Sequence, residues 1–419
     1  MHSSEEAHVQ KRGDTMDDTP RKQRQPDPER QQLILTRNRQ THGMVLAAML
    51  LFLVLLFGLI NLLRPKSTFS ENENRKLSAY PKPTLASIAD GSFMSSLESA
   101  FSDQFFGRDR WIESKLRMDT FLGRRESNGV YLCDDRYLME IPSAPDPAVL
   151  GKTLNAMNNF AVRHNDLNIS AMIVPNASYV MRDYLPKNAP AHSQQEDLFS
   201  IEQTLSPYMQ FIDVTQALKN HVRDGVFYRT DHHWTSLGAC FAFEAAAEKL
   251  GIATPLTDYS IHILANDFEG TLASKSGRHG VTDTVTAYEA LGSDVSYYVI
   301  YDSAQEKAGS MFVSSALDTK DKYTVFFGGN HPLVTLKTTA NTGKVLLLFK
   351  DSYANCFVQF LIPYYDQIVM VDPRYYYDNA DQLITQRAVT DVLFLYNDST
   401  FIADTALSDT LNAGLRSAE

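Results

Sequence analysis

The feature that most constrains this chain is an uncharged apolar run from Met44 to Leu63. At 1.5 Å of rise per residue, about 20 helical residues match the ~30 Å hydrocarbon layer of a bilayer. The run therefore predicts one transmembrane helix over residues 44–63. A cleaved signal peptide is the alternative, but the run is longer than a typical signal-peptide core, and no obvious small-residue cleavage site follows it.

The segments beside this run are polar. Residues 1–43 are rich in Gln, Asp, Arg and Pro and lack apolar periodicity, which predicts a disordered cytoplasmic tail. Basic residues both precede and follow the run, so their count leaves the orientation open. We expect the commoner arrangement for such an anchor, with the short tail inside and the folded domain outside. The prolines and polar residues of 64–90 predict an extended juxtamembrane linker.

Length and charge bound the remaining part, residues 91–419. The 419 residues suffice for one large domain or two ordinary ones, and 44% hydrophobic residues can supply a core. A net charge of -11 gives no basic field for nucleic acid, so we expect no nucleic-acid partner. Cys133, Cys240 and Cys356 lack metal or redox spacing and are interpreted as small apolar residues. Whether Cys240 and Cys356 pair stays open.

The pattern along the domain alternates strands and helices. Two helices are predicted within 91–123, a hairpin over 130–139, and further helices over 149–164 and 236–250. Short apolar runs rich in branched and aromatic residues predict strands at 170–175, 211–214, 344–349, 367–371 and 392–396. This alternation predicts an α/β fold with a largely parallel sheet flanked by helices. The strand-like pieces within 255–340 predict a β-rich insertion.

The run Tyr228 to Thr235 places a carboxylate, two imidazoles and an indole at four consecutive positions. A carboxylate beside a histidine can select the ring tautomer and stabilise the imidazolium, so Asp231 and His233 form half of a hydrolase-type triad. Zinc binding by His232 and His233 is the alternative. Adjacent ligands are uncommon and no His-x-x-x-His or cysteine pair accompanies them, so no metal is expected.

Ser352 is the candidate nucleophile. It follows the apolar run 345–349 and precedes a helix-like segment, a position where helix amides can bind an oxyanion. An Asp-Ser pair after a strand is by itself more often a helix cap. With His233 as general base, Ser352 completes a triad. Gly329 and Asn330 are candidates for the oxyanion contacts.

Five further side chains are candidates for substrate binding: Arg229, Trp234, Asn176, Tyr353 and Arg374. Of these, Asn176 follows the predicted strand 170–175. Ordinary structural roles compete for three of them. Trp234 could be a packing residue, Arg229 could pair with a carboxylate, and Asn176 could cap a loop.

Several motifs, taken in order, resemble the DHHW protein family over roughly residues 68–400. They are Ser-Glu-Asn-Glu-Asn-Arg at 70–75, Phe-Phe-Gly-Arg-Asp at 105–109, Asn-Gly-Val-Tyr at 128–131, Tyr228 to Ala239, Phe-Glu-Gly-Thr at 268–271, Gly-Gly-Asn at 328–330 and Lys-Asp-Ser-Tyr-Ala-Asn at 350–355. That family is similar to the SGNH-hydrolase-like domains of alginate O-acetylation proteins. The resemblance implies that fold and the triad Asp231, His233 and Ser352. Lys350 departs from the glycine that ordinary SGNH enzymes carry before their Asp-Ser pair.

The resemblance also implies a function. The protein is expected to be a membrane-anchored, extracytoplasmic serine O-acetyltransferase or acylesterase that modifies a cell-surface polysaccharide through an acyl-serine. No cofactor is implied. Because acetyl donors such as acetyl-CoA are cytoplasmic, a membrane-bound O-acyltransferase is implied as the partner that passes the acyl group outward. The alternative is a non-catalytic polysaccharide-binding or assembly component.

Overall fold

The computed structural model describes residues 28–416 except Glu71 and Ser303. The chain divides into two compact units, with the boundary between Pro65 and Lys66. In the first unit, helix α1 (Pro28–Leu63) contains a stretch, Leu35–Asn61, that is long and apolar enough to cross a membrane.

The helix begins earlier than predicted. Residues 28–43 are helical, and the prediction of a disordered tail is wrong for them. After Pro28, a residue that is tolerated in the first turn, good helix formers dominate, and the first glycine is Gly43. The remainder of the predicted tail, residues 1–27, lies outside the described residues.

The second unit starts with short elements where an extended linker was predicted. Strands β1 (Phe69–Ser70) and β2 (Arg75–Lys76) form a small hairpin, and helix α2 (Leu85–Ala89) follows. Asp103, at the end of helix α3 (Ser92–Asp103), accepts hydrogen bonds from the Arg75 guanidinium and the Ser78 amide. These bonds tie residues 75–78 to α3, so this stretch is more ordered than a free tether. Helix α4 (Arg108–Phe121) completes the predicted helix pair.

An eight-stranded sheet forms the centre of the second unit, in the order β11-β10-β12-β14-β13-β15-β6-β7. Its strands are β6 (Asn168–Val174), β7 (Gln210–Phe211), β10 (Tyr297–Tyr301), β11 (Glu306–Ala308), β12 (Leu333–Thr338), β13 (Val345–Lys350), β14 (Gln367–Val371) and β15 (Asp391–Asn397). The five strands from β14 to β7 are parallel, as predicted. A separate small antiparallel sheet contains β3 (Glu126–Ser127), β4 (Val130–Leu132) and β5 (Leu138–Glu140).

The predicted β-rich insertion is only partly separate. Strands β8 (Tyr259–Phe268) and β9 (Asp283–Ala290) form their own hairpin. Strands β10, β11 and β12 instead extend the main sheet, because β12 pairs antiparallel with β14, placing Leu333 opposite Val371. Strand patterns in the sequence show which segments are extended but not which segments pair. The predicted end of the insertion at about residue 340 is therefore wrong, because β10, β11 and β12 belong to the main sheet.

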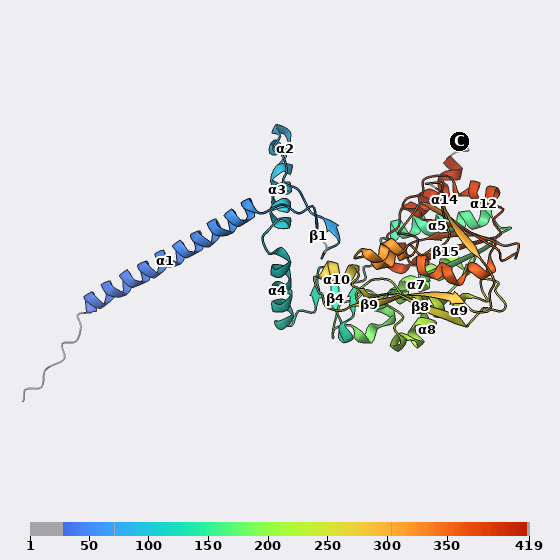
Figure 1. Cartoon of the computed structure of the whole chain (residues 1–419), viewed down its shortest axis with the longest axis horizontal. Helices are drawn as coiled ribbons and strands as arrows, with labels where there is room; N and C mark the ends of the chain where they lie inside the picture. The colour runs from blue at the N-terminus through green and yellow to red at the C-terminus, as the bar shows by residue number, and fades with distance from the viewer. Residues whose placement is uncertain (1–27, 71, 303, 417–419) are drawn as a thin grey trace, which may run out of the picture. The chain divides into compact units, whose positions relative to one another are not determined.

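Two apolar cores cover the two faces of the sheet, and the alternation along β13 shows why. Leu346 and Leu348 enter one core, whereas Leu347 and Phe349 enter the other. Helices α5 (Pro147–Arg163), α7 (Gln194–Leu205), α12 (Ala380–Arg387) and α14 (Ala406–Arg416) contribute to the second core. Of these, α5, α12 and α14 lie side by side in Figure 1. Helices α8 (Thr215–Asn220), α9 (Ser236–Ala246) and α11 (Ala354–Phe357) contribute to the first core.

The remaining helices are short. They are α6 (Ala177–Val180), α10 (Thr271–Ser276) and α13 (Asp398–Phe401), with 3-10 turns at Asp134–Arg136, Arg182–Tyr184, Val222–Asp224, Ser314–Asp318, Lys322–Val325, Val358–Phe360 and Ile362–Tyr364. The three cysteines are free, and Cys240 and Cys356 are buried, as their apolar interpretation predicts.

Candidate active site

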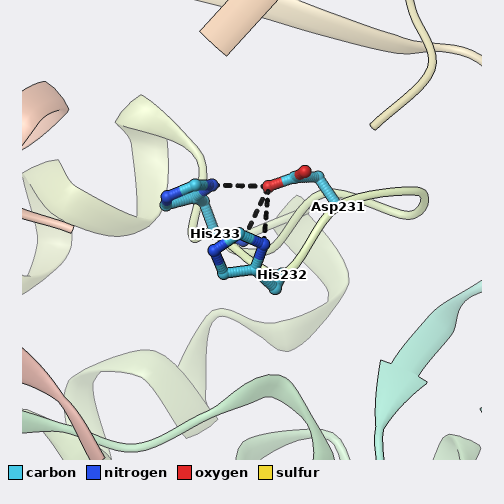
Figure 2. Close-up of side chains that lie close together, drawn as sticks. All are labelled: Asp231, His232 and His233. Atoms are coloured by element: carbon cyan, nitrogen blue, oxygen red, sulfur yellow. Dashed lines mark hydrogen bonds and ion pairs between the residues drawn. The ribbon is translucent and has the colours of Figure 1, made fainter. Parts of the chain in front are cut away.

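Asp231, His233 and Ser352 form a continuous hydrogen-bonded chain. The Nε2 atom of His233 lies 2.7 Å from the Ser352 hydroxyl oxygen, and its Nδ1 atom lies 2.5 Å from Oδ1 of Asp231. The His233 backbone amide also donates to that carboxylate oxygen at 3.0 Å. Figure 2 shows Asp231 with both neighbouring imidazoles turned toward the same oxygen. The geometry is that of a nucleophile, a base and a group that orients the base.

The loop that carries Asp231 and His233 is braced from both ends. Asp283, at the start of β9, accepts hydrogen bonds from the amides of Arg229 and Thr230, each at 2.9 Å. At the other end, the Thr235 hydroxyl caps α9 by accepting from the Gly238 amide at 3.1 Å. The loop therefore has little freedom to move its two functional side chains.

The second oxygen of Asp231 is held by the start of helix α10. Both the amide and the hydroxyl of Thr271 donate to Oδ2 of Asp231 at 2.8 Å. The preceding Gly270 packs so closely that a Cβ atom there would lie 2.3 Å from the Asp231 Cβ. Glycine is required at this position because the backbone itself touches the carboxylate residue.

Burial and neighbouring charges set the protonation states of the pair. Burial, and then the proximity of His232, lower the pKa of His233 to about 4, although Asp231 acts in the opposite direction. Burial alone would raise the pKa of Asp231, but the two imidazoles and the Thr271 amide hold it well below its usual range. At neutral pH the site thus contains a carboxylate beside a neutral imidazole, which is the form that can accept a proton.

Ser352 is presented on the turn between β13 and α11. The preceding Asp351 is fully buried and accepts from the amides of Tyr353 and Asn397 at 2.9 Å, which fixes the turn. The Tyr323 ring stacks on the His233 imidazole with centroids 3.8 Å apart, and its hydroxyl donates to the Ser352 carbonyl at 2.9 Å. Within the described residues the Ser352 amide has no hydrogen-bond partner, so it can donate to a developing oxyanion.

The two predicted oxyanion residues differ in what they can donate. The Gly329 amide donates to the Phe326 carbonyl at 3.3 Å, so it is already engaged. The Asn330 side chain is exposed, and its Oδ1 accepts from Lys350 Nζ at 3.2 Å and from Asn355 Nδ2 at 3.3 Å. The Asn330 Nδ2 group has no acceptor within the described residues and is therefore available as a donor. The preceding Phe327 has φ of 65°, a left-handed conformation that is strained for a bulky residue.

Three of the predicted substrate contacts, Trp234, Tyr353 and Asn176, are buried. Trp234 and Tyr353 are fully buried: the Trp234 indole donates to the Tyr353 carbonyl at 3.0 Å, and the Tyr353 hydroxyl donates to the His232 carbonyl at 2.6 Å. Asn176 is buried, and its side chain bonds to Gln194, Asn397 and Ser399. These side chains fix the loops around the triad instead of facing a substrate, because their polar atoms are occupied within the fold.

The two predicted arginines lie nearer to solvent. Arg229 is exposed, and its guanidinium lies over the Tyr137 ring, 5.5 Å from the centroid. Arg374 forms a two-point hydrogen bond with Asp372, at 2.8 and 2.6 Å, and retains 32% side-chain exposure. Both are open to solvent, and the expectation that they bind substrate stays a prediction.

Asp231, His232 and His233 also form a group of potential metal ligands, with their donor atoms within 4.8 Å of one another. The contact between His233 Nδ1 and Asp231 Oδ1 at 2.5 Å is a hydrogen bond that an intervening cation would have to open. His232 is directed to Thr271, whose hydroxyl lies 2.8 Å from its Nδ1 atom. The expectation of a metal-free site stays a prediction.

Four supporting residues were missed by the sequence reasoning: Thr271, Asp283, Tyr323 and Lys350. Thr271 and Lys350 lie within two of the family motifs, at 268–271 and 350–355, and this position could have identified them as candidates. Asp283 and Tyr323 lie in no motif, and only the tertiary fold brings them to the site.

The family assignment rests on the sequence match. A sequence model of the DHHW protein family matches residues 73–144 and 148–371, which is more than half of the chain. The chain belongs to the DHHW family. No curated protein matches it.

Solved structures with TM-scores above 0.5 share the fold. A DHHW family protein from Eubacterium siraeum is 26% identical, with a TM-score of 0.58 over 68% of this chain and 95% of that one. Bacillus cereus PatB1, in a structure with a sulfonyl adduct, is 19% identical, with a TM-score of 0.54 over 66% of this chain and 98% of that one. The O-acetyltransferase domain of Pseudomonas putida AlgJ matches at 16% identity, with a TM-score of 0.42 over 70% and 99%. The present chain thus has the predicted SGNH-like α/β fold.

Proposed function

We propose that this DHHW protein is a membrane-anchored, extracytoplasmic serine acyltransferase that transfers an acyl group, in the first instance acetyl, to a hydroxyl of a cell-surface polysaccharide. The observation that carries the proposal is the placement of His233 between Asp231 and Ser352, with contacts of 2.5 and 2.7 Å. A buried capping serine has no need of a neutral imidazole that is itself oriented by a carboxylate. Ser352, in contrast, is partly exposed and can meet a substrate.

In the first half-reaction Ser352 takes the acyl group from its donor. The serine Oγ forms a bond to the acyl carbonyl carbon while its proton passes to His233 Nε2. The Ser352 amide and the Asn330 Nδ2 group are the proposed donors to the resulting oxyanion. Collapse of the tetrahedral intermediate breaks the bond to the leaving group, which receives the proton from His233. Acyl-Ser352 remains.

The second half-reaction reverses these roles. A sugar hydroxyl gives its proton to His233 and forms a bond to the acyl carbon, and collapse returns the proton to Ser352. Water in place of the sugar would release the free acid, which makes the protein an esterase. Whether a sugar hydroxyl or a water molecule reaches acyl-Ser352 therefore decides between transfer and hydrolysis. The solvent-accessible Arg229 and Arg374 are the proposed sugar contacts.

The apolar stretch Leu35–Asn61 supports the placement at a membrane. With the folded unit outside, the enzyme would be separated from the cytoplasmic pool of activated acyl groups. A multispanning O-acyltransferase is the proposed partner that delivers the acyl group to Ser352.

The test uses the full chain in detergent with p-nitrophenyl acetate as donor and oligosaccharides as acceptors. Acetylated sugar should form with the unmodified protein, and Ser352→Ala should lower the rate by about 10⁴-fold or more. Ser102→Ala, which changes an exposed serine in α3, is the matched control and should retain the rate. Equal activity in Ser352→Ala would contradict the proposal. Oligosaccharide binding without acetyl transfer by the unmodified protein would favour the non-catalytic alternative.

A further inference from the structure

Lys350 is a buried cation immediately before the Asp351-Ser352 pair. It is the last residue of β13 and is 2% exposed. Burying an ammonium group is unfavourable unless it gains hydrogen bonds and a counter-charge, so the surroundings of Lys350 require an explanation. Its Nζ atom lies 2.8 Å from Asn355 Oδ1, 3.2 Å from Asn330 Oδ1 and 3.6 Å from Asp372 Oδ2.

Neutralising Asp372 does not explain this lysine. Arg374 already bonds to both oxygens of that carboxylate, at 2.8 and 2.6 Å, whereas Lys350 is 3.6 Å away. The closest contacts of the ammonium group are instead the two asparagine amides. Asp372 supplies a counter-charge that favours the protonated form of Lys350, and this opposes the lowering of its pKa by burial.

An ammonium group can only donate hydrogen bonds, and this property fixes both amides. Asn330 and Asn355 must each turn their carbonyl oxygens toward Lys350. The Nδ2 group of Asn355 then donates to Asn330 Oδ1 at 3.3 Å, which gives that oxygen two donors. The Asn330 Nδ2 group is consequently forced to the opposite side, away from the lysine. It has no acceptor within the described residues.

The orientation of the Asn330 amide matters because Asn330 is linked to Ser352 through Asn355. Asn355, which bonds to Asn330, lies one turn after the serine, and its amide donates to the Ser352 carbonyl at 3.2 Å. An exposed asparagine without the lysine could rotate its amide and present its oxygen to the site. An oxygen would repel a developing oxyanion, whereas an N–H group stabilises it.

We propose that Lys350 is a positioning residue for acyl transfer: through Asn330 Oδ1 it holds the Asn330 amide with its N–H donors toward the oxyanion formed at Ser352. The inference rests on the proposed function, which supplies that oxyanion. It also gives a role to the lysine that replaces the expected glycine before the Asp-Ser pair. In its charged form Lys350 only donates hydrogen bonds, and it exchanges no proton with the substrate.

A double-mutant cycle tests this role, with the acetylation rate of Ser352 by p-nitrophenyl acetate as readout in full-length protein. The rate is expressed per reactive site, counted by sulfonyl fluoride labelling, so that loss of folded protein does not alter it. Removing an oxyanion donor costs about 10²–10³-fold in other enzymes, and Asn330→Ala should slow acetylation by about 10²-fold. Lys350→Met should slow it by about 10-fold or more in the natural sequence.

The coupling between the two positions decides the matter. In the Asn330→Ala background, Lys350→Met should change the per-site rate by less than about 3-fold, because the residue through which it acts is absent. Equal effects of Lys350→Met in both backgrounds, or no effect in the natural sequence, would overturn the inference. If Lys350→Met does not fold, Asn355→Ala removes one donor to Asn330 Oδ1 and should show the same coupling on a smaller scale. Failure of the proposed function itself gives a different result, in which Ser352→Ala still becomes acetylated.

Discussion

His233 and Ser352 lie 119 positions apart in the sequence, yet the imidazole Nε2 and the serine Oγ are 2.7 Å apart. Two separate braces produce this contact. Asp283 and Thr271 fix the loop that carries the histidine, while Asp351 and Tyr323 fix the turn that carries the serine.

The Thr271 hydroxyl is predicted to tune the triad through Asp231. Thr271→Val keeps the side-chain shape and the backbone amide but removes the hydroxyl that donates to Asp231 Oδ2 at 2.8 Å. A hydrogen bond to a charged group contributes about 1.5–3 kcal/mol, so we expect acetylation to slow by about 10-fold or more. Thr271→Ser retains the hydroxyl and should stay near the natural rate. Equal losses in Val and Ser variants would assign the effect to packing.

The pH dependence follows from the lowered pKa of His233. The imidazole must be neutral to accept a proton. Because its pKa is about 4, it stays neutral at pH values near 6.5, where an ordinary histidine becomes protonated. The acid limb of the acetylation profile should therefore lie near pH 4. His232→Gln removes the neighbouring imidazole that lowers the pKa of His233, so the limb should move to higher pH. A limb near 6.5 in the unmodified protein would contradict this account.

His233 also affects stability. Its contribution to the free energy of unfolding changes with pH in the opposite direction to that of a histidine whose pKa is raised by a salt bridge. The unfolded imidazole binds a proton below about 6.5, but the folded one binds it only near 4. Protonation thus favours the unfolded chain between these values, and His233 should lower the free energy of unfolding as the pH falls from 6.5 to 4. Urea titrations of the unmodified protein and of His233→Gln should show a steeper decline for the former.

Gly270 is predicted to be intolerant of any side chain. A Cβ at this position would lie 2.3 Å from the Asp231 Cβ and 2.6 Å from its Oδ2, so Gly270→Ala must displace either the carboxylate or α10. We expect loss of acetylation together with a lower melting temperature. The control is Gly151→Ala within α5, where an added Cβ would lie within 4 Å of no atom beyond its chain neighbours and the backbone of its own helix. Alanine there should stabilise the helix by about 0.5–1 kcal/mol. A Gly270→Ala protein with natural activity would contradict the proposed close approach.

Trp234 is predicted to matter for stability more than for substrate binding. The side chain is fully buried and donates to the Tyr353 carbonyl at 3.0 Å. Trp234→Phe leaves that carbonyl without this donor, so the free energy of unfolding should fall by about 1–3 kcal/mol. The Michaelis constant for an oligosaccharide acceptor should stay unchanged. A large rise in that constant with unaltered stability would return Trp234 to the substrate contacts.

The sequence predicted the parallel strands and the triad because both leave local patterns. Strands β13, β14 and β15 are continuous apolar runs with buried residues on both faces, and the Asp-x-His segment is a compact motif. The edge of the sheet was not predictable in the same way. The sequences of β10 and β12 predict strands, but they do not show whether these strands form a separate insertion or extend the main sheet. That depends on the pairing of β12 with β14, which is a property of the tertiary fold.

The supporting residues show the same limit. Asn176 and Tyr353 follow or flank strand ends, a position typical of substrate contacts, but burial directs their polar atoms inward. Lys350 looked like a departure from an expected glycine, and only its contacts with Asn330 and Asn355 show what such a lysine can do. Residue type and position in the sequence identified candidates, while the hydrogen-bond partners separated the reacting groups from the groups that hold them.

The central claim, that Ser352 is an acyl-accepting nucleophile, is tested most directly by peptide mass spectrometry. The full-length protein is treated with p-nitrophenyl acetate, quenched in acid and digested, and the peptide that contains Ser352 is examined for an added acetyl group. The account predicts acetyl-Ser352 in the unmodified protein and its loss in His233→Ala, where the base is missing. Acetylation of other residues while Ser352 stays unmodified, or equal labelling of Ser352 in His233→Ala, would contradict it.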